Sequence, residues 1–152
     1  GSYSVAGSYR PAFAESALPN GLRYPNADPG RALIERVIRD TRPDEPVAAL
    51  PYLPGFHFAT GRPVVARRIY LLPFNTRPEV EREYLCELDR AGVRYVMFGD
   101  HPALVGGEHL RLRSYAPLVD AHLARHFEPV GKAGHWQLLR RVSPGVACAP
   151  PR

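Results

Sequence analysis

Proline residues divide this chain into short segments and limit the regular structure that each segment can form. The 152 residues include 17 prolines, which lie between apolar stretches rather than in a single tract. Because proline lacks a backbone N–H and has a fixed φ, helix interiors and central strands exclude it. The sequence therefore predicts short helices and strands connected by rigid turns, with no polyproline linker.

The composition is that of an ordinary globular domain. A chain of 152 residues is expected to form one domain, and 45% hydrophobic and 23% charged residues are typical fractions. The formal net charge of +5 comes almost entirely from arginine, because Lys132 is the only lysine. The arginines are scattered without a long run of like charges, so nucleic-acid binding is not expected. No stretch approaches the roughly 18 apolar residues that a membrane span needs.

The two cysteines, Cys86 and Cys148, are too few for a disulfide framework and lack the spacing of metal ligands. They neither require nor exclude an oxidising compartment. The sequence leaves open whether they pair with each other.

Apolar periodicity and capping signals predict an α/β domain over residues 28–142. The predicted helices cover residues 28–41, 76–92 (from a Thr76/Glu79 capping box to Gly92) and a third segment that Ser114 caps. Glu81 and Asp89 are expected on the outer face of the second helix, and Leu118 is expected to face inward in the third. The predicted strands cover residues 46–52, 64–72 and 93–98, and residues 127–130 and 135–142 form a closing β-hairpin. Residues 1–27 are expected to be an extended lead-in and residues 143–152 a flexible, proline-rich tail.

Helices alternating with buried strands predict a small mixed, largely parallel sheet with flanking helices. The alternation is Rossmann-like, but no glycine-rich phosphate-binding loop follows a strand. We therefore expect no nucleotide cofactor, and no other cofactor motif is present.

Few side chains stand in a catalytic pattern, and we assign no catalytic residue. Asp100 and His101 follow the end of a predicted strand, where α/β sheets place ligands, and His109 lies nearby. They could line a pocket or serve acid–base chemistry, although a polar, glycine-containing loop explains them more simply. His122 and His126 are four residues apart, but no third ligand is evident, so we expect core histidines and no metal site.

The segment LPYLPGFHFATGRP, residues 50–63, is too apolar for a solvated loop. It is also too rich in proline for a regular helix or central strand. The candidates to face a substrate or a membrane in and after it are Tyr52, His57, Arg62, Arg67 and Arg68. The alternative is structural, with Arg62 tying down its own loop and the other two arginines bracketing a sheet edge.

A succession of short patterns carries a resemblance to a known family. The patterns are TRPDEPV (41–47), LPYLPGFHFATGR (50–62), VRYVM (93–97), YAPL (115–118) and LLRR (138–141). Together they resemble the C-terminal extracytoplasmic domain of bacterial GT-C membrane glycosyltransferases of family 39, which are related to protein O-mannosyltransferases and aminoarabinose transferases. The chain departs from the family pattern at Glu45-Pro46 and at His57.

The resemblance implies a parent enzyme that transfers a sugar from a polyprenyl-phosphate donor at the outer face of the cytoplasmic membrane. The family's catalytic carboxylate lies in an early loop between membrane helices, so no catalytic residue carries over to this sequence. The domain would cap or support the active site through residues 52–68. Its partners would be the membrane-embedded part of the same polypeptide and polyprenyl-phosphate or anionic headgroups, on the periplasmic side.

Two other hypotheses remain open from the sequence. One is a freestanding α/β module that binds an anionic or sugar-phosphate ligand between Arg62 and the Asp100 loop. The other is a small enzyme that acts through Asp100, His101 or His109.

Overall fold

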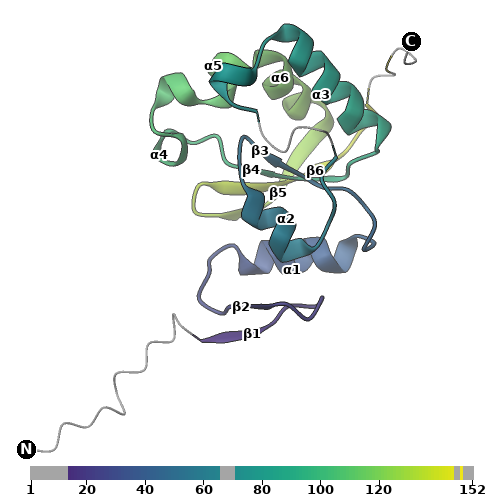
Figure 1. The fold of residues 1–152 in the computed structure, drawn as a ribbon, viewed down its shortest axis with the longest axis vertical. Helices are drawn as coiled ribbons and strands as arrows, with labels where there is room; N and C mark the ends of the chain where they lie inside the picture. The colour runs from purple at the N-terminus through teal and green to yellow at the C-terminus, as the bar shows by residue number, and fades with distance from the viewer. Residues whose placement is uncertain (1–13, 66–70, 146–147, 149–152) are drawn as a thin grey trace, which may run out of the picture.

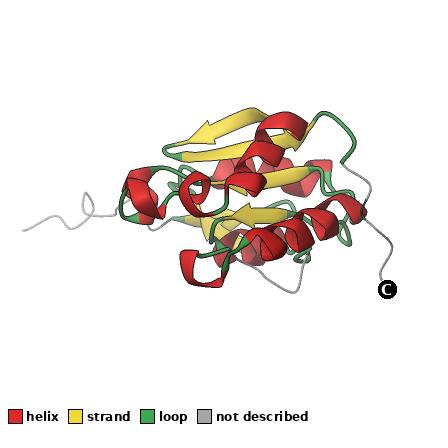
Figure 2. Ribbon diagram, turned by 90° about the horizontal axis from the view of Figure 1, so that it is seen from above, coloured by secondary structure: helices red, strands yellow, loops and turns green. Residues whose placement is uncertain are grey.

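A four-stranded sheet lies between two layers of helices (Figures 1 and 2). The computed structural model describes residues 14–65, 71–145 and 148. The strands lie in the order β3 (Ala48–Leu50), β4 (Tyr95–Phe98), β6 (Trp136–Arg141) and β5 (Phe127–Ala133). The prediction of a mixed α/β fold is therefore confirmed.

Among these strands only the β3–β4 pairing is parallel, whereas β4–β6 and β5–β6 are antiparallel. The expectation of a largely parallel sheet is wrong for the described strands. A short turn joins β5 to β6 and makes this pair antiparallel, and β6, rather than β5, is the strand that pairs with β4, running in the opposite direction to it.

The helices divide between the two faces of the sheet. One face carries α1 (Arg31–Asp40) and α2 (Pro54–Thr60), and the other carries α3 (Pro78–Arg90), α5 (Leu112–Tyr115) and α6 (Pro117–His126). The short helices η3 (Pro73–Asn75), α4 (Pro102–Val105) and η4 (Glu108–Leu110) lie in the connections. None of the helices in the described part of the chain is long and apolar enough to cross a membrane.

Alternate side chains of the strands enter two separate cores, because successive residues of a strand point to opposite faces. Tyr95 and Met97 of β4 pack with α1 and α2. Val96, between them, packs with α3 and α6 on the other face. Helix α1 buries its predicted apolar stripe in the first core and begins three residues after Asp28, whose carboxylate accepts the Gly30 N–H.

The proline-rich segment contains a regular helix, α2, so the expectation that it could not form one is wrong. Pro54 lies at the first helical position, where a backbone N–H would have no partner within the helix, so proline costs no hydrogen bond there. Gly61 ends the helix with a φ of 67°, and the other prolines of the segment lie outside it. The positions of the prolines, rather than their number, therefore decide this local structure.

Helix α3 ends at Arg90, and the left-handed stop predicted at Gly92 follows it with a φ of 64°, but the predicted capping box is wrong. Thr76 donates its hydroxyl to the Leu72 carbonyl at 2.7 Å instead of capping a helix. The helix begins two residues later at Pro78, with Arg77 in the N-cap position.

Glu81 was expected on the outer face of this helix and is instead 1% exposed. Its carboxylate accepts the backbone N–H groups of Leu118 and Val119 at 2.8 and 3.2 Å. A negative charge is favourable there because the start of α6 presents unpaired N–H groups and the positive end of its dipole. Leu118, predicted to face inward, is 40% exposed.

The third predicted helix is divided in two, and Ser114 does not cap it. Ser114 lies within α5 and donates its hydroxyl to the Glu108 carbonyl at 3.1 Å. Pro117 disfavours helical geometry at Ala116, where α5 stops and α6 starts.

The lead-in contains structure of its own. Strands β1 (Glu15–Ala17) and β2 (Arg23–Pro25) pair antiparallel, and Leu18 between them is buried against the α1 core. Most of the predicted strand over residues 64–72 lies outside the described residues, and Val64 forms an isolated parallel bridge with Val47.

Candidate functional site

The carboxyl ends of β3 and β4 meet at one edge of the sheet because these two strands are parallel. Gly99 extends the pairing by donating its N–H to the Leu50 carbonyl at 2.9 Å. Helix α4 and the turn between β5 and β6 lie on this same side of the molecule (Figure 1). Three hollows open here, at the position where α/β sheets bind their ligands.

Trp136 lies between two of these hollows and lines both. Its indole ring packs directly on Gly99, where any Cβ atom would overlap the ring. The close approach therefore requires glycine at the end of β4, and it holds the only tryptophan of the chain in a fixed place.

The first hollow has a volume of about 270 Å³ and is largely apolar. Its lining includes Tyr52, Leu72, Leu104, Tyr115 and Trp136. Tyr115 donates its hydroxyl to the Leu71 carbonyl at 2.7 Å, and burial raises the pKa of Tyr115 to about 12. The phenol therefore remains neutral, and this hollow offers shape and apolar surface rather than an acid or a base.

The second hollow is larger, at about 420 Å³, and lies between the start of α1 and α2. Its lining includes Leu33, Ile34, Leu53, Phe56 and Phe58. Phe58 is 75% exposed, and Tyr52 at the first hollow is 49% exposed. We call the exposed side chains of Tyr52 and Phe58 the aromatic rim, because they border the two apolar hollows.

The third hollow is smaller, about 140 Å³, and polar. His101, Arg111, Lys132, His135 and Gln137 line it together with Phe98 and Asp100. The rings of His101 and His135 stack with their centroids 3.6 Å apart and 7° between their planes. We call this hollow the basic pocket.

Of the loop residues that the sequence singled out, His101 lies in the basic pocket and His109 lies outside all three hollows, exposed on η4. Asp100 lines the pocket, but its buried carboxylate accepts the N–H groups of Leu112 and Arg113 at the start of α5. Asp100 therefore stabilises a helix start and is poorly placed to act as a general base.

Arg62 lies at the opposite end of α1 from the hollows. Its buried guanidinium donates to Thr41 Oγ1 at 2.8 Å and to the carbonyls of Ile38 and Thr41, each at 2.9 Å. These contacts agree with the structural alternative, in which Arg62 ties down its own loop. His57 is partly buried in α2, where burial lowers its pKa, and Arg67 and Arg68 lie outside the described residues.

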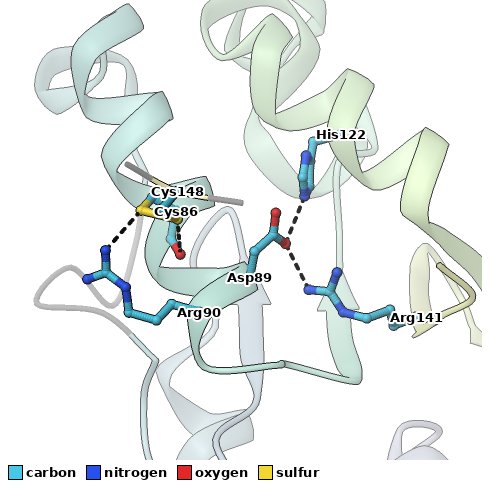
Figure 3. Close-up of a disulfide and its surroundings, with 6 residues drawn as sticks. All are labelled: Cys86, Asp89, Arg90, His122, Arg141 and Cys148. Carbon is cyan, nitrogen blue, oxygen red and sulfur yellow. Dashed lines mark hydrogen bonds and ion pairs between the residues drawn. A yellow bond between two sulfur atoms is a disulfide. The ribbon is translucent and has the colours of Figure 1, made fainter. Parts of the chain in front are cut away.

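A second polar cluster joins α3, α6 and β6 away from the hollows (Figure 3). Asp89 Oδ1 accepts hydrogen bonds from His122 Nε2 and Arg141 Nη2, both at 3.0 Å. Asp89 was expected on the outer face of its helix, but its side chain is only 5% exposed because these two partners converge on it. Within residues 14–65, 71–145 and 148, no three His, Cys, Asp or Glu side chains are arranged to hold a metal ion.

Cys86 and Cys148 form a disulfide beside this cluster, with Cα atoms 5.2 Å apart (Figure 3). The bond ties Cys148, in the segment expected to be a flexible tail, to helix α3. The sequence had left this pairing open.

Sequence reasoning missed most of the basic pocket and the apolar hollows. Lys132, His135 and Trp136 lie within five residues, around one turn, and include the only lysine and the only tryptophan of the chain. That clustering of rare residues is the signal that could have drawn attention to the turn.

No family model matches the chain, and no curated protein or solved structure is significantly similar to it.

Proposed function

We propose that this chain is the extracytoplasmic domain of a membrane glycosyltransferase of the GT-C type, and that it caps or supports an active site in the membrane-embedded part of the same polypeptide. In this proposal the parent enzyme takes its sugar from a polyprenyl-phosphate donor. The domain positions the membrane-embedded part and does not catalyse by itself. Its α/β architecture is interpreted as Rossmann-like, without a nucleotide loop and closed by the β5–β6 hairpin.

The aromatic rim is the observation that carries the proposal. Tyr52 and Phe58 are large, exposed and adjacent to apolar hollows rather than scattered singly over the surface. Exposed apolar side chains beside apolar hollows are typical of interaction sites, and aromatic residues are enriched both in interface cores and at membrane–water boundaries. A membrane-embedded partner would bury this surface.

The disulfide supports an extracytoplasmic location for the domain. Disulfides persist in oxidising compartments such as the bacterial periplasm and are rare in the cytosol. The Cys86–Cys148 bond is therefore in keeping with a domain on the outer side of the cytoplasmic membrane.

The first test is the reading frame that encodes this chain. We expect segments that span the membrane in the same frame. A frame that encodes this domain alone would overturn the proposal.

The second test compares two exposed phenylalanines in the complete enzyme. Phe58 is 75% exposed at the second hollow, whereas Phe74 is 82% exposed and borders neither apolar hollow. In isolated membranes supplied with a polyprenyl-phosphate-linked sugar, we expect Phe58→Ser to lower the transfer rate by about tenfold, the effect of losing one interface anchor. Phe74→Ser should leave the rate unchanged, and equal rates for the two variants would show that the rim does not dock.

A further inference from the structure

We propose that the basic pocket is a binding site for a phosphate group. The inference does not depend on docking of the aromatic rim, because the pocket has its own lining and its own charge. The ligand chemistry is that of a phosphate monoester or inorganic phosphate, from either a lipid headgroup or free solution.

Among the described residues that line the basic pocket, Lys132 is a cation without a carboxylate partner. Arg111 lies 3.6 Å from the Asp100 carboxylate and 3.3 Å from that of Glu108. Glu108 also pairs with Arg113. Both carboxylates near the pocket are therefore neutralised by arginines, whereas the side-chain ammonium of Lys132 forms no ion pair or hydrogen bond with any described residue.

The hydrogen-bond donors of the pocket are also incompletely used. His101 Nδ1 accepts the Ala103 N–H at 3.1 Å, so a neutral His101 carries its proton on Nε2 and can donate it. His135 stacks on this ring, and its nitrogens have no hydrogen-bond partner in the described part of the chain. Arg111 uses Nε and Nη1 within the protein, which leaves Nη2 as a further donor.

These donors come from three segments and face one hollow of about 140 Å³. Lys132 lies near the end of β5 and His135 lies in the turn between β5 and β6, His101 follows β4, and Arg111 precedes α5. A phosphate group accepts several hydrogen bonds at once and favours an ammonium and a guanidinium as partners. The pocket therefore suits phosphate better than a neutral ligand or a cation.

Trp136 and Lys132 supply two independent readouts in the intact chain. The lone tryptophan follows His135 directly, so its fluorescence should respond when the pocket is occupied. Because Lys132 carries the only lysine amine, its rate of acylation can be followed by peptide mapping. We expect inorganic phosphate to change the fluorescence saturably and to slow acylation of Lys132 with the same apparent Kd.

The variants separate a built site from general charge attraction. Lys132→Gln and His135→Gln should each weaken phosphate binding by about tenfold, the usual effect of losing a hydrogen bond to a charged group. Lys132→Arg should retain binding. Arg125→Gln removes one positive charge from the exposed side of α6 and should leave the Kd unchanged.

Vesicles distinguish the source of the phosphate. Protection of Lys132 by phosphatidylcholine vesicles that contain phosphatidic acid, but not by inorganic phosphate, would identify a lipid headgroup as the ligand. Equal protection by both would identify phosphate itself. The inference is overturned if neither protects Lys132, or if Arg125→Gln weakens binding as much as Lys132→Gln.

Discussion

Arg62 provides the sharpest test of how the proline-rich segment is held in place. Its guanidinium donates to three backbone carbonyls, those of Ile38, Thr41 and Thr60, and to the Thr41 hydroxyl. Two of the carbonyls belong to the end of α1 and one to the end of α2, where helices have carbonyls without intrahelical partners. We predict that Arg62→Met destabilises the fold because these buried acceptors lose their donors.

The magnitude follows from the number of acceptors. A buried acceptor left without a partner costs about 1–3 kcal/mol, so the three backbone carbonyls together would cost at least about 3 kcal/mol. Removing the buried guanidinium recovers part of its desolvation cost, and the methionine fills much of the space, so we expect a net loss of about 3–4 kcal/mol. Domains of this size have total stabilities of only about 5–15 kcal/mol.

Urea unfolding followed by Trp136 fluorescence measures the change. With a urea m value of about 2 kcal/mol/M, the midpoint should fall by more than about 1 M. Arg125→Met, on the exposed side of α6, is the matched control and should change the free energy of unfolding by less than about 0.5 kcal/mol. A loss below about 1 kcal/mol for Arg62→Met would refute the structural role and return Arg62 to the candidates that face a ligand.

Three further predictions concern other contacts of the fold. Cys86→Ser removes a disulfide with a sequence separation of 62 residues and should lower the free energy of unfolding by about 4 kcal/mol. Dithiothreitol should lower the stability of the wild type by the same amount and leave that of the variant unchanged. Gly99→Ala places a methyl group against the Trp136 ring and should cost about 1–3 kcal/mol, seen as a lower melting temperature and a shift in tryptophan emission. The hydrogen-bonded ion pair with Arg94 lowers the pKa of Glu45, so this pair stabilises the fold above the ordinary glutamate pKa, and the contribution is lost as the pH falls through the lowered value. Glu45→Gln should therefore make the unfolding free energy fall less steeply between neutral and acidic pH. An unchanged fall would contradict the pairing.

The parts of the fold that could be predicted from the sequence are those that local patterns determine. Helix α1 follows from one apolar stripe, although it begins at Arg31 rather than at the predicted Asp28-Pro29 start, and β3 and β4 follow from short runs that are buried on both faces. Helix α2 was missed because proline was counted without regard to position, although Pro54 lies where a helix accepts it. Buried charges were missed for a different reason. Glu81 and Asp89 look like surface residues until α6 and β6 bring their hydrogen-bond partners to them.

The candidate site shows the same division between local and non-local information. The position of Asp100 and His101 at a sheet edge could be predicted, because a strand end fixes it. The contribution of Lys132, His135 and Trp136 could not be predicted, because it depends on the pairing of β6 with β4. These strands are about 40 residues apart in the sequence, and no local pattern specifies their register.

The disulfide makes residues 86–148 a closed covalent ring. All the side chains proposed to hold phosphate lie inside this ring, whereas Tyr52 and Phe58 of the aromatic rim lie outside it. A protease that cuts one backbone bond within the ring leaves both pieces joined through the disulfide. The basic pocket can therefore stay assembled after a single cleavage as long as its surroundings remain oxidising. A chain cut once between Phe58 and Cys86 has no such link, and its two parts separate when they unfold.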